Sequence, residues 1–250
     1  MKSGLNSETF RVSVVFPSYN EKDTIVEAID RTSKSLGNRL LEIIIVDDNS
    51  PDGTWRVVQE LKNPKVRLIR RMFKGGLASA LHRGIHEAKG NAIVWLDCDL
   101  GIPPEIIPKL VEKLAEYDVA IGSRYVKYGE ETRAIWRAWL SICINLWARL
   151  FMGSKIKDYT SGFAAVRREV FDKIDFTPTG FGEYFIEFSY KCIKNNLKVI
   201  EVGYSYGRRK GGLSKSDGSK IVLLKYGLQY ALKIIKWRLT IIKKNEKLLQ

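Results

Sequence analysis

The sequence predicts an α/β protein in which a mostly parallel sheet carries helices on both faces. Five short apolar runs rich in β-branched residues are each bounded by polar or glycine-containing loops, as expected for buried strands. Between them lie segments with the apolar spacing of amphipathic helices. This alternation favours βαβ units and a sheet covered on both sides. In chain order the strand runs are RVSVVF (11–16), EIIIV (42–46), KVRLI (65–69), AIVWL (92–96) and DVAIG (118–122), and the helical segments are 24–36, 77–88 and 105–116.

Composition limits the classes of function. The 250 residues, 45% of them hydrophobic, can bury one sizeable core. The formal net charge of +14 indicates an anionic partner, namely nucleic acid, an acidic membrane surface or a phosphorylated small molecule, unless it only keeps the protein soluble. The three cysteines are odd in number and widely spaced, which favours a reducing compartment over a disulfide framework. The first ten residues contain no apolar stretch, so no signal peptide is predicted.

Polar signatures follow four of the five strand runs. They are PSYNE (17–21), DDNSPDGT (47–54), DCDLG (97–101) and SRY (123–125). In open α/β sheets, ligands bind in the crevice beyond the carboxyl ends of the strands. The sequence therefore predicts a functional site at this edge of the sheet.

The pair Asp97 and Asp99 is the main candidate for a cation site. On an extended backbone the two side chains point to the same side, and Cys98 points away. Two carboxylates so close repel unless a cation joins them, and their hard oxygens suit Mg²⁺ or Mn²⁺. A D-x-D triplet also arises readily by chance, and its position at the end of a strand is what strengthens this interpretation.

Other polar residues have weaker interpretations. Asp48 could accept hydrogen bonds from ribose hydroxyls or from a base edge, whereas Asp52 is expected to support a turn. His82 and His86 lie four residues apart on an expected helix, a spacing that can bind zinc. They lack a third ligand, so surface histidines are the preferred interpretation.

Two segments of the second half are amphipathic. Residues 135–152 are mostly apolar but carry a narrow polar stripe on every fourth residue, formed by Arg137, Ser141, Asn145 and Arg149. The segment is short for a bilayer span and contains arginines, so it is expected to lie in the membrane interface or, in part, in the core. The basic stretch within 219–250 suits anionic lipid headgroups or is a solvated face, and 207–215 is a candidate phosphate clamp or a plain basic loop. We expect a catalytic domain over 1–218 and a separate C-terminal helical segment over 219–250.

Taken together, the motifs resemble the family 2 glycosyltransferases, and within them the dolichyl-phosphate mannose synthases. They run in family order from about residue 12 to residue 215 and are PSYNE, VDDNSPDGT, KGGLASAL with EAKGN, LDCDL with PPE, IGSRY, SGFAAVRREV and RKGGLSK. The resemblance implies a GT-A fold, in which a Rossmann-like nucleotide half is joined to an acceptor half. It also implies transfer of mannose from GDP-mannose to dolichyl or polyprenyl phosphate, with inversion at the anomeric carbon.

The same resemblance assigns roles to residues. Those implied to bind the nucleotide sugar are Pro17, Tyr19, Asn20, Glu21, Val46, Asp48, Asp97, Cys98, Asp99, Arg209 and Lys215. Asp97 and Asp99 match the D-x-D whose Mg²⁺ or Mn²⁺ grips the donor diphosphate, and Arg209 and Lys215 match the loop that closes over it. Arg124 and Arg137 match arginines that hold the lipid phosphate. Asp97, Asp99, Arg124, Arg137, Arg209 and Lys215 form the expected catalytic set.

The implied setting is the cytoplasmic side of a membrane, where the protein would bind peripherally to an anionic surface, without nucleic acid and with room for a membrane-anchoring partner. Two alternatives stay open. One is a related transferase that uses UDP-glucose or UDP-GlcNAc, or a soluble acceptor. The other is a non-catalytic basic protein that binds membrane or nucleic acid.

Three features depart from the family pattern. Gly101 stands where relatives often have Gln or another polar residue that helps the metal. Glu183 stands about where relatives often have a lysine. Some relatives continue into transmembrane helices, whereas this sequence ends at Gln250, so the expectation is that the protein reaches its lipid peripherally.

Overall fold

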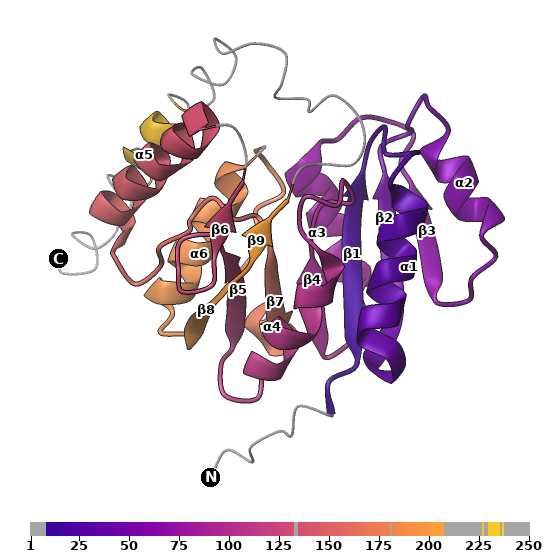
Figure 1. Ribbon diagram of the computed structural model, residues 1–250, viewed down its shortest axis with the longest axis horizontal. Coiled ribbons are helices and arrows are strands. Elements are labelled where there is room, and N and C mark those ends of the chain that lie inside the picture. The colour runs from indigo at the N-terminus through magenta and orange to yellow at the C-terminus, as the bar shows by residue number, and fades with distance from the viewer. Residues whose placement is uncertain are drawn as a thin grey trace, which may run out of the picture.

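A seven-stranded sheet with helices on both faces forms the body of the molecule (Figure 1). The computed structural model describes residues 9–132, 135–180, 182–207, 227, 230–235 and 237. The strand order is β3-β2-β1-β4-β7-β5-β8, and a second sheet pairs β6 with β9. The strands are β1 (Val12–Ser18), β2 (Leu40–Asp47), β3 (Val66–Arg70), β4 (Ala92–Trp95), β5 (Val119–Ser123), β6 (Glu130–Glu131), β7 (Ala164–Arg167), β8 (Val199–Gly203) and β9 (Ser205–Tyr206).

All five strand runs predicted from sequence form strands of the main sheet. The pairs β1–β2, β1–β4, β2–β3 and β5–β8 are parallel, whereas β7 runs antiparallel between β4 and β5. The prediction of a mostly parallel sheet is therefore confirmed. Strands β6 to β9 were not predicted.

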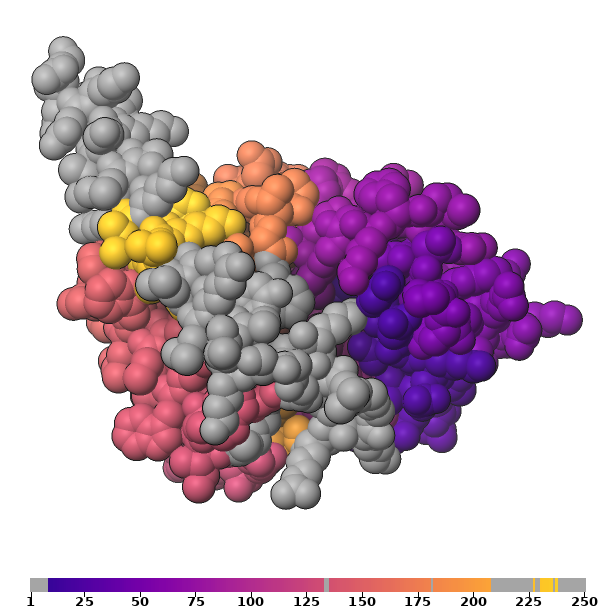
Figure 2. All heavy atoms as spheres, turned by 90° about the horizontal axis from the view of Figure 1, so that it is seen from above, coloured from indigo at the N-terminus to yellow at the C-terminus, as the bar shows by residue number. Residues whose placement is uncertain are grey.

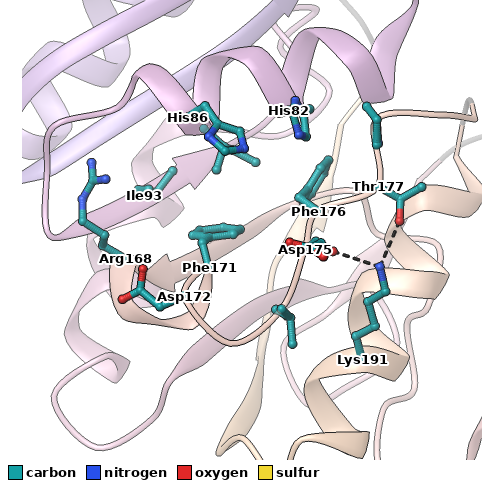
Figure 3. Close-up of a pocket in the computed structure, with 13 residues that line it drawn as sticks. His82, His86, Ile93, Arg168, Phe171, Asp172, Asp175, Phe176, Thr177 and Lys191 are labelled. Carbon is teal, nitrogen blue, oxygen red and sulfur yellow. Dashed lines mark hydrogen bonds between the residues drawn. The ribbon is translucent and has the colours of Figure 1, made fainter.

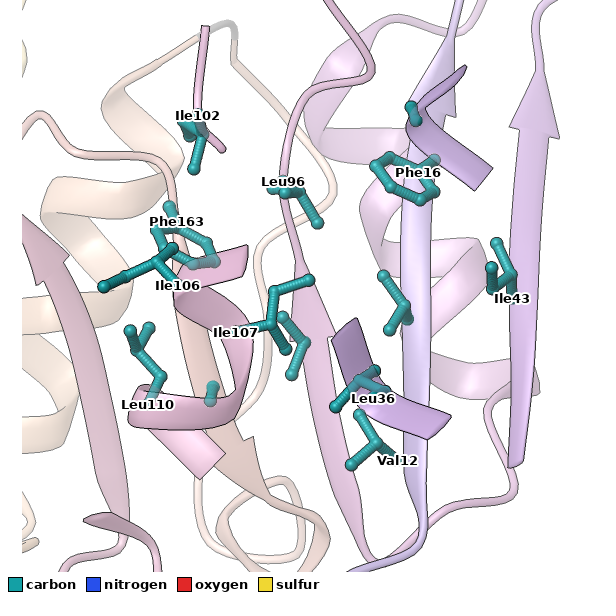
Figure 4. Close-up of a cluster of buried hydrophobic side chains, with 14 of the residues drawn as sticks. Val12, Phe16, Leu36, Ile43, Leu96, Ile102, Ile106, Ile107, Leu110 and Phe163 are labelled. Atoms are coloured by element: carbon teal, nitrogen blue, oxygen red, sulfur yellow. The ribbon is translucent and has the colours of Figure 1, made fainter. Parts of the chain in front are cut away.

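Helices cover both faces of the sheet and divide the core into two layers. The α-helices are α1 (Ile25–Leu36), α2 (Thr54–Glu60), α3 (Leu77–Glu87), α4 (Ile107–Lys113), α5 (Ile135–Met152) and α6 (Glu183–Lys194), and the short 3₁₀ helices are η2 (Gly37–Arg39), η3 (Pro104–Ile106) and η4 (Arg168–Val170). One buried cluster joins α1 and α4 to the sheet (Figure 4). The other joins α3, α6 and the inner side of α5 to the opposite face. The three predicted helical segments contain α1, α3 and α4.

The strand order creates a switch point between β1 and β4. From β1 the chain moves outward to β2 and β3, and it then returns to β4 on the other side of β1. Helix α3 packs closely on β1, because Gly84 offers no side chain where a Cβ would lie 2.3 Å from a methyl of Val15. Crevices at such switch points are the usual ligand sites of α/β sheets, so the loops after β1 and β4 are expected to border one.

Helix α5 lies at the flank of the molecule opposite β3 and α2, as both views show (Figures 1 and 2). It spans the segment that the sequence assigned to an interface helix. No helix within the described ranges combines the length and hydropathy needed to cross a bilayer. The predicted division at residue 218 falls outside the described residues and stays a prediction. Within the C-terminal segment, the side chain of Ile234 is buried in the cluster beneath α6.

Candidate active site

The loops after β1 and β2 are braced against each other by hydrogen bonds. The backbone N–H of Asn20 donates to Ser50 Oγ at 3.0 Å, and that of Glu21 donates to Thr54 Oγ1 at 3.0 Å. Ser50 is in turn fixed by Asp47, which accepts from its N–H at 2.9 Å and from its hydroxyl at 2.5 Å. The two loops therefore form one polar rim beyond the ends of adjacent strands.

Asp52 supports the turn, as predicted. Its carboxylate accepts from the N–H of Thr54 at 2.9 Å, from the Thr54 hydroxyl at 2.6 Å and from the N–H of Lys22 at 3.1 Å. Burial opposes ionisation, but the hydrogen bonds from Thr54 and Lys22 outweigh it and lower the pKa of Asp52. The carboxylate therefore stays charged and holds the turn.

Asp48 follows β2 directly, and its side chain is buried. Arg71 Nε donates to Oδ1 at 2.6 Å, and the backbone N–H of Gly76 donates to Oδ2 at 2.8 Å. Asp48 thus ties the loop after β2 to the start of α3. Its proposed contact with a ribose or base stays a prediction.

The remaining nucleoside-pocket candidates lie where β1 and β2 run side by side. Pro17 and Val46 are paired across the two strands and are buried. Tyr19 is half-buried, and the Nζ of Lys74 lies 4.0 Å from the centre of its ring. Pro17 and Val46 are therefore neighbours on adjacent strands, and Tyr19 follows directly after β1.

Asp97 and Asp99 lie just beyond β4 and differ in exposure. The strand ends at Trp95, and Leu100 adopts a left-handed φ of 61°, so the backbone turns here. Asp97 is exposed, whereas Asp99 is buried and its Oδ1 accepts from the N–H of Gly101 at 2.9 Å. The expectation of two carboxylates side by side on an extended strand was therefore wrong in detail, because the turn begins between them.

Cys98, between the two aspartates, lies against the end of β1. Its Sγ is buried and donates to the carbonyl of Pro17 at 3.5 Å. Burial, followed by the charges of Glu21, Asp97 and Asp99, raises the pKa of the thiol. The loop after β4 therefore lies against the end of β1.

A divalent cation fits this donor set. Among the described residues no three His, Cys, Asp or Glu side chains gather as a metal site, so protein carboxylates would contribute Asp97 and Asp99 alone. Mg²⁺ usually takes one or two carboxylates and completes its shell with water and substrate phosphate oxygens. The exposed carboxylate of Asp97 and the buried, hydrogen-bonded carboxylate of Asp99 lie in the same loop and meet that requirement.

Arg124, at the end of β5, is the centre of a buried network. Its guanidinium donates from Nε to Asp158 Oδ2 at 2.8 Å, from NH2 to Asp158 Oδ1 at 2.7 Å and to Thr160 Oγ1 at 2.8 Å, and from NH1 to Glu131 at 3.0 Å. Burial opposes the charge, but Asp158 outweighs it and raises the pKa of Arg124. The arginine therefore remains charged in the interior. Its predicted role at a lipid phosphate stays a proposal.

The polar stripe of α5 faces this network. Asn145 Nδ2 donates to Thr160 Oγ1 at 2.8 Å, and Ser141 Oγ lies 3.1 Å from the same oxygen. Arg137 is half-buried, with its guanidinium 5.1 Å from the centre of the Trp136 ring. Part of the apolar surface of the helix faces outward, whereas Ile144, Phe151 and Met152 pack inward. The exposed apolar side chains are Ile135, Trp136, Trp139, Leu146, Trp147 and Leu150.

Sequence reasoning missed three members of this network: Glu131, Asp158 and Thr160. The only signal was the stretch DYT (158–160), separated by five residues from the end of an apolar helix, and it does not specify a partner. Arg209 and Lys215 lie outside the described residues. Glu183 accepts from Lys233 Nζ at 3.1 Å and so joins the start of α6 to the C-terminal segment.

A separate cavity of about 530 Å³ lies between α3 and the segment after β7 (Figure 3). His82 and His86 line it, with ring centres 4.5 Å apart, and Lys191 donates to Thr177 at its rim. Burial and the neighbouring His86 lower the pKa of His82. None of the strand-end residues lines this cavity, and the histidines have no third metal ligand among the described residues.

Comparison with known proteins identifies the family. The sequence profile of glycosyl transferase family 2 matches residues 13–175. The chain belongs to glycosyl transferase family 2. It is 40% identical to a dolichol-phosphate mannosyltransferase of Pyrococcus furiosus over 91% of this chain and 64% of that protein, so it spans just under two thirds of that relative. It is 34% identical to the polyprenol monophosphomannose synthase of Mycolicibacterium smegmatis over 85% of this chain and 83% of that protein.

Solved structures support the fold. The crystal structure of glucosyl-3-phosphoglycerate synthase from Mycobacterium tuberculosis, in complex with Mn²⁺, UDP and glucosyl-3-phosphoglycerate, superposes with a TM-score of 0.68 at 20% identity, over 93% of this chain and 81% of that one. The expected GT-A-like architecture of the family is therefore confirmed.

Proposed function

We propose that the protein transfers mannose from GDP-mannose to dolichyl or another polyprenyl phosphate, with inversion at the anomeric carbon. The names of the relatives from Pyrococcus furiosus and Mycolicibacterium smegmatis support the sugar and the class of acceptor. The GDP moiety is inferred from the resemblance of the motifs. The product would be a mannosyl phospholipid for glycosylation.

The observation that carries the proposal is the orientation of α5. Ser141 and Asn145 of its polar stripe contact the network around Arg124, while Trp139, Leu146 and Leu150 face outward. A helix with an exposed apolar face lies stably in the interface of a bilayer. A lipid acceptor held there would present its phosphate toward the inner, polar side of the helix, where Arg137 lies half-buried.

The donor would occupy the switch point between β1 and β4. Pro17, Tyr19, Val46 and Asp48 would contact the nucleoside. Asn20 and Glu21 lie in the loop after β1, Cys98 lies in the loop after β4, and the carboxylates of Asp97 and Asp99 would lie near the diphosphate. Arg209 and Lys215 would close over that diphosphate. A cation held by Asp97 and Asp99, Mg²⁺ or Mn²⁺, would neutralise the negative charge on the leaving group.

The acceptor phosphate is itself the nucleophile. The second pKa of a phosphate monoester is about 6, so the group is largely ionised at neutral pH and needs no general base. Attack of a phosphate oxygen on the anomeric carbon would form the new C–O bond as the bond to the nucleoside diphosphate breaks. The protein would contribute positioning and charge stabilisation. Arg137 and Arg124 would hold the attacking phosphate, and Arg124 also donates to Thr160, which contacts α5.

The proposed location is the cytoplasmic face of a membrane, with peripheral attachment. The outward face of α5 and the net charge of +14 suit an anionic surface, and a membrane-anchoring partner is compatible with both. Nucleic acid is not a proposed ligand.

The test is a transfer assay with purified protein, Mn²⁺, dolichyl phosphate and a panel of radiolabelled GDP- and UDP-sugars. Label from GDP-mannose is expected to enter the lipid phase. The variant Asp99→Ala should lose at least about a thousandfold in rate, because one of two cation-binding carboxylates is removed. Its circular dichroism spectrum should match that of the wild type.

Other outcomes separate the alternatives. Label entering the lipid phase only from UDP-glucose or UDP-GlcNAc would replace the proposed donor. No transfer from any sugar, together with strongly salt-sensitive DNA binding, would favour the non-catalytic basic protein.

A further inference from the structure

Position 101 has no room for a side chain, because Tyr206 fills the space. A Cβ atom on Gly101 would lie 2.8 Å from Tyr206 Oη, 2.9 Å from Tyr206 Cζ and 3.1 Å from Asp99 Oδ1. Gly101 does not have a left-handed φ, so its backbone conformation does not require glycine. The tyrosine does.

Tyr206 is held firmly in this place. It belongs to β9, which pairs with β6, and its carbonyl accepts from the Thr132 hydroxyl. The next residue, Gly207, donates its N–H to the carbonyl of Gly101 at 2.8 Å. The side chain is 6% exposed, and the guanidinium of Arg124 lies 5.9 Å from the centre of its ring. The hydroxyl therefore has a defined position beside the loop after β4.

The hydroxyl and the Asp99 carboxylate border the same space. A Cβ atom built on Gly101 would lie 2.8 Å from Tyr206 Oη and 3.1 Å from Asp99 Oδ1. The described residues supply two carboxylates there and no third acidic or histidine ligand. Divalent cations of this class bind oxygen donors, neutral ones included. A phenol oxygen in this place can thus join the set.

We propose that the Tyr206 hydroxyl is the third protein oxygen of the Asp97–Asp99 cation site, in the place that a side chain at position 101 would otherwise take. The inference rests on the proposed function, since it concerns the cation that accompanies the donor diphosphate. It explains how a chain with glycine at position 101 completes the protein part of this site.

The test measures Mn²⁺ binding by electron paramagnetic resonance in the presence of GDP, without sugar or lipid. Tyr206→Phe removes one oxygen and keeps the ring, and it is expected to weaken Mn²⁺ binding about tenfold, within the range for groups that support a metal site. Its GDP binding without Mn²⁺ should equal that of the wild type. An unchanged Mn²⁺ affinity overturns the proposal.

Tyr204→Phe is the matched control. Tyr204 is also buried, two residues earlier, and its ring packs edge-to-face on Phe163. The same substitution there should leave Mn²⁺ affinity unchanged. An equal loss in both variants would show a general packing effect and would overturn the assignment to Tyr206.

A pair of variants tests the shared place itself. Gly101→Gln alone should bind Mn²⁺ worse than the wild type, because its Cβ collides with Tyr206. Gly101→Gln combined with Tyr206→Ala should bind Mn²⁺ more tightly than Tyr206→Ala alone, because an amide oxygen then occupies the vacated space. A double variant no tighter than Tyr206→Ala overturns the proposal.

The wild type separates this inference from the proposed function. If the wild type binds no Mn²⁺ with either GDP or UDP, the cation-dependent part of the proposed function fails. If it binds Mn²⁺ and Tyr206→Phe is unchanged, only the role of Tyr206 fails. Mannose transfer to lipid is measured independently in either case.

Discussion

Helices α1 and α5 arrange polar and apolar side chains in opposite ways. Helix α1 buries Ile25, Ala28 and Ile29 and turns Asp30 and Lys34 to the surface, as helices of water-soluble domains do. Helix α5 buries Ser141 and Asn145 and exposes several large apolar residues, Trp139 and Leu150 among them. The same sheet thus carries one helix built to face water and one whose outer face suits a lipid surface.

The largest expected effect concerns the buried charges beneath α5. Asp158→Ala leaves the charge of Arg124 in the interior with its main partner removed. It is expected to lower the free energy of unfolding by about 3–5 kcal/mol, measured by urea denaturation. The matched control on α1 is Asp30→Ala, which removes the exposed pair with Lys34 (2.7 Å) and should cost less than about 1 kcal/mol. Equal losses in the free energy of unfolding would show that the buried network beneath α5 contributes no more to stability than an exposed ion pair.

Arg137 tests whether the inner side of α5 serves the acceptor. Arg137→Ala should raise the KM for polyprenyl phosphate at least about tenfold, because a charge-assisted hydrogen bond contributes roughly 1.5–3 kcal/mol. The KM for the nucleotide sugar should not change. Arg31→Ala on α1, which breaks pairs with Glu27 and Glu105, should leave both constants unchanged. An unaltered acceptor KM in Arg137→Ala would remove this residue from the acceptor site.

The smallest expected effect concerns the outer face. Trp139→Ser with Leu150→Ser should weaken binding to anionic phospholipid vesicles several-fold, because about 25 cal/mol per Å² of buried apolar surface is lost. The stability of the free protein should stay the same, since both side chains are exposed (64% and 73%). Val26→Ser on α1 is the control and should not alter vesicle binding.

Cys143 gives an independent measurement of the same contact. It is exposed on α5, between Trp139 and Leu146. Vesicles should slow its reaction with a water-soluble maleimide, whereas Cys98 and Cys192, both buried with raised thiol pKa values, should react only after unfolding. An unchanged rate at Cys143 in the presence of vesicles would argue that α5 faces something other than lipid.

The parts of the fold that follow from local pattern were predictable. Runs such as 42–46 are short and rich in β-branched residues, which predicts buried strands. The polar residues that follow parallel strands gather at one edge of the sheet. The polar stripe of α5 was also visible in the sequence. That the stripe faces inward was not, because the partners of Ser141 and Asn145 are supplied by Thr160, beyond the end of the helix.

Features that depend on long-range packing were not predictable. The antiparallel direction of β7 leaves no mark in the short strand AAVR. The turn after β4 separates Asp97 from Asp99 in exposure, although an extended strand would have kept them together. Gly101 appeared as a missing side chain, and only the structure places Tyr206, 105 positions later in the sequence, against it.

The two-stranded sheet of β6 and β9 lies between the segment that leads to α5 and the loop after β4. Strand β6 leads into α5 within four residues, and β9 ends at Tyr206 beside Asp99. The two strands are joined by the backbone pairing of Glu131 with Tyr206 and by the hydrogen bond from the Thr132 hydroxyl to the Tyr206 carbonyl. This sheet therefore links the segment just before α5 to the loop that carries Asp99 through backbone hydrogen bonds, one of them from the N–H of Gly207 to the carbonyl of Gly101.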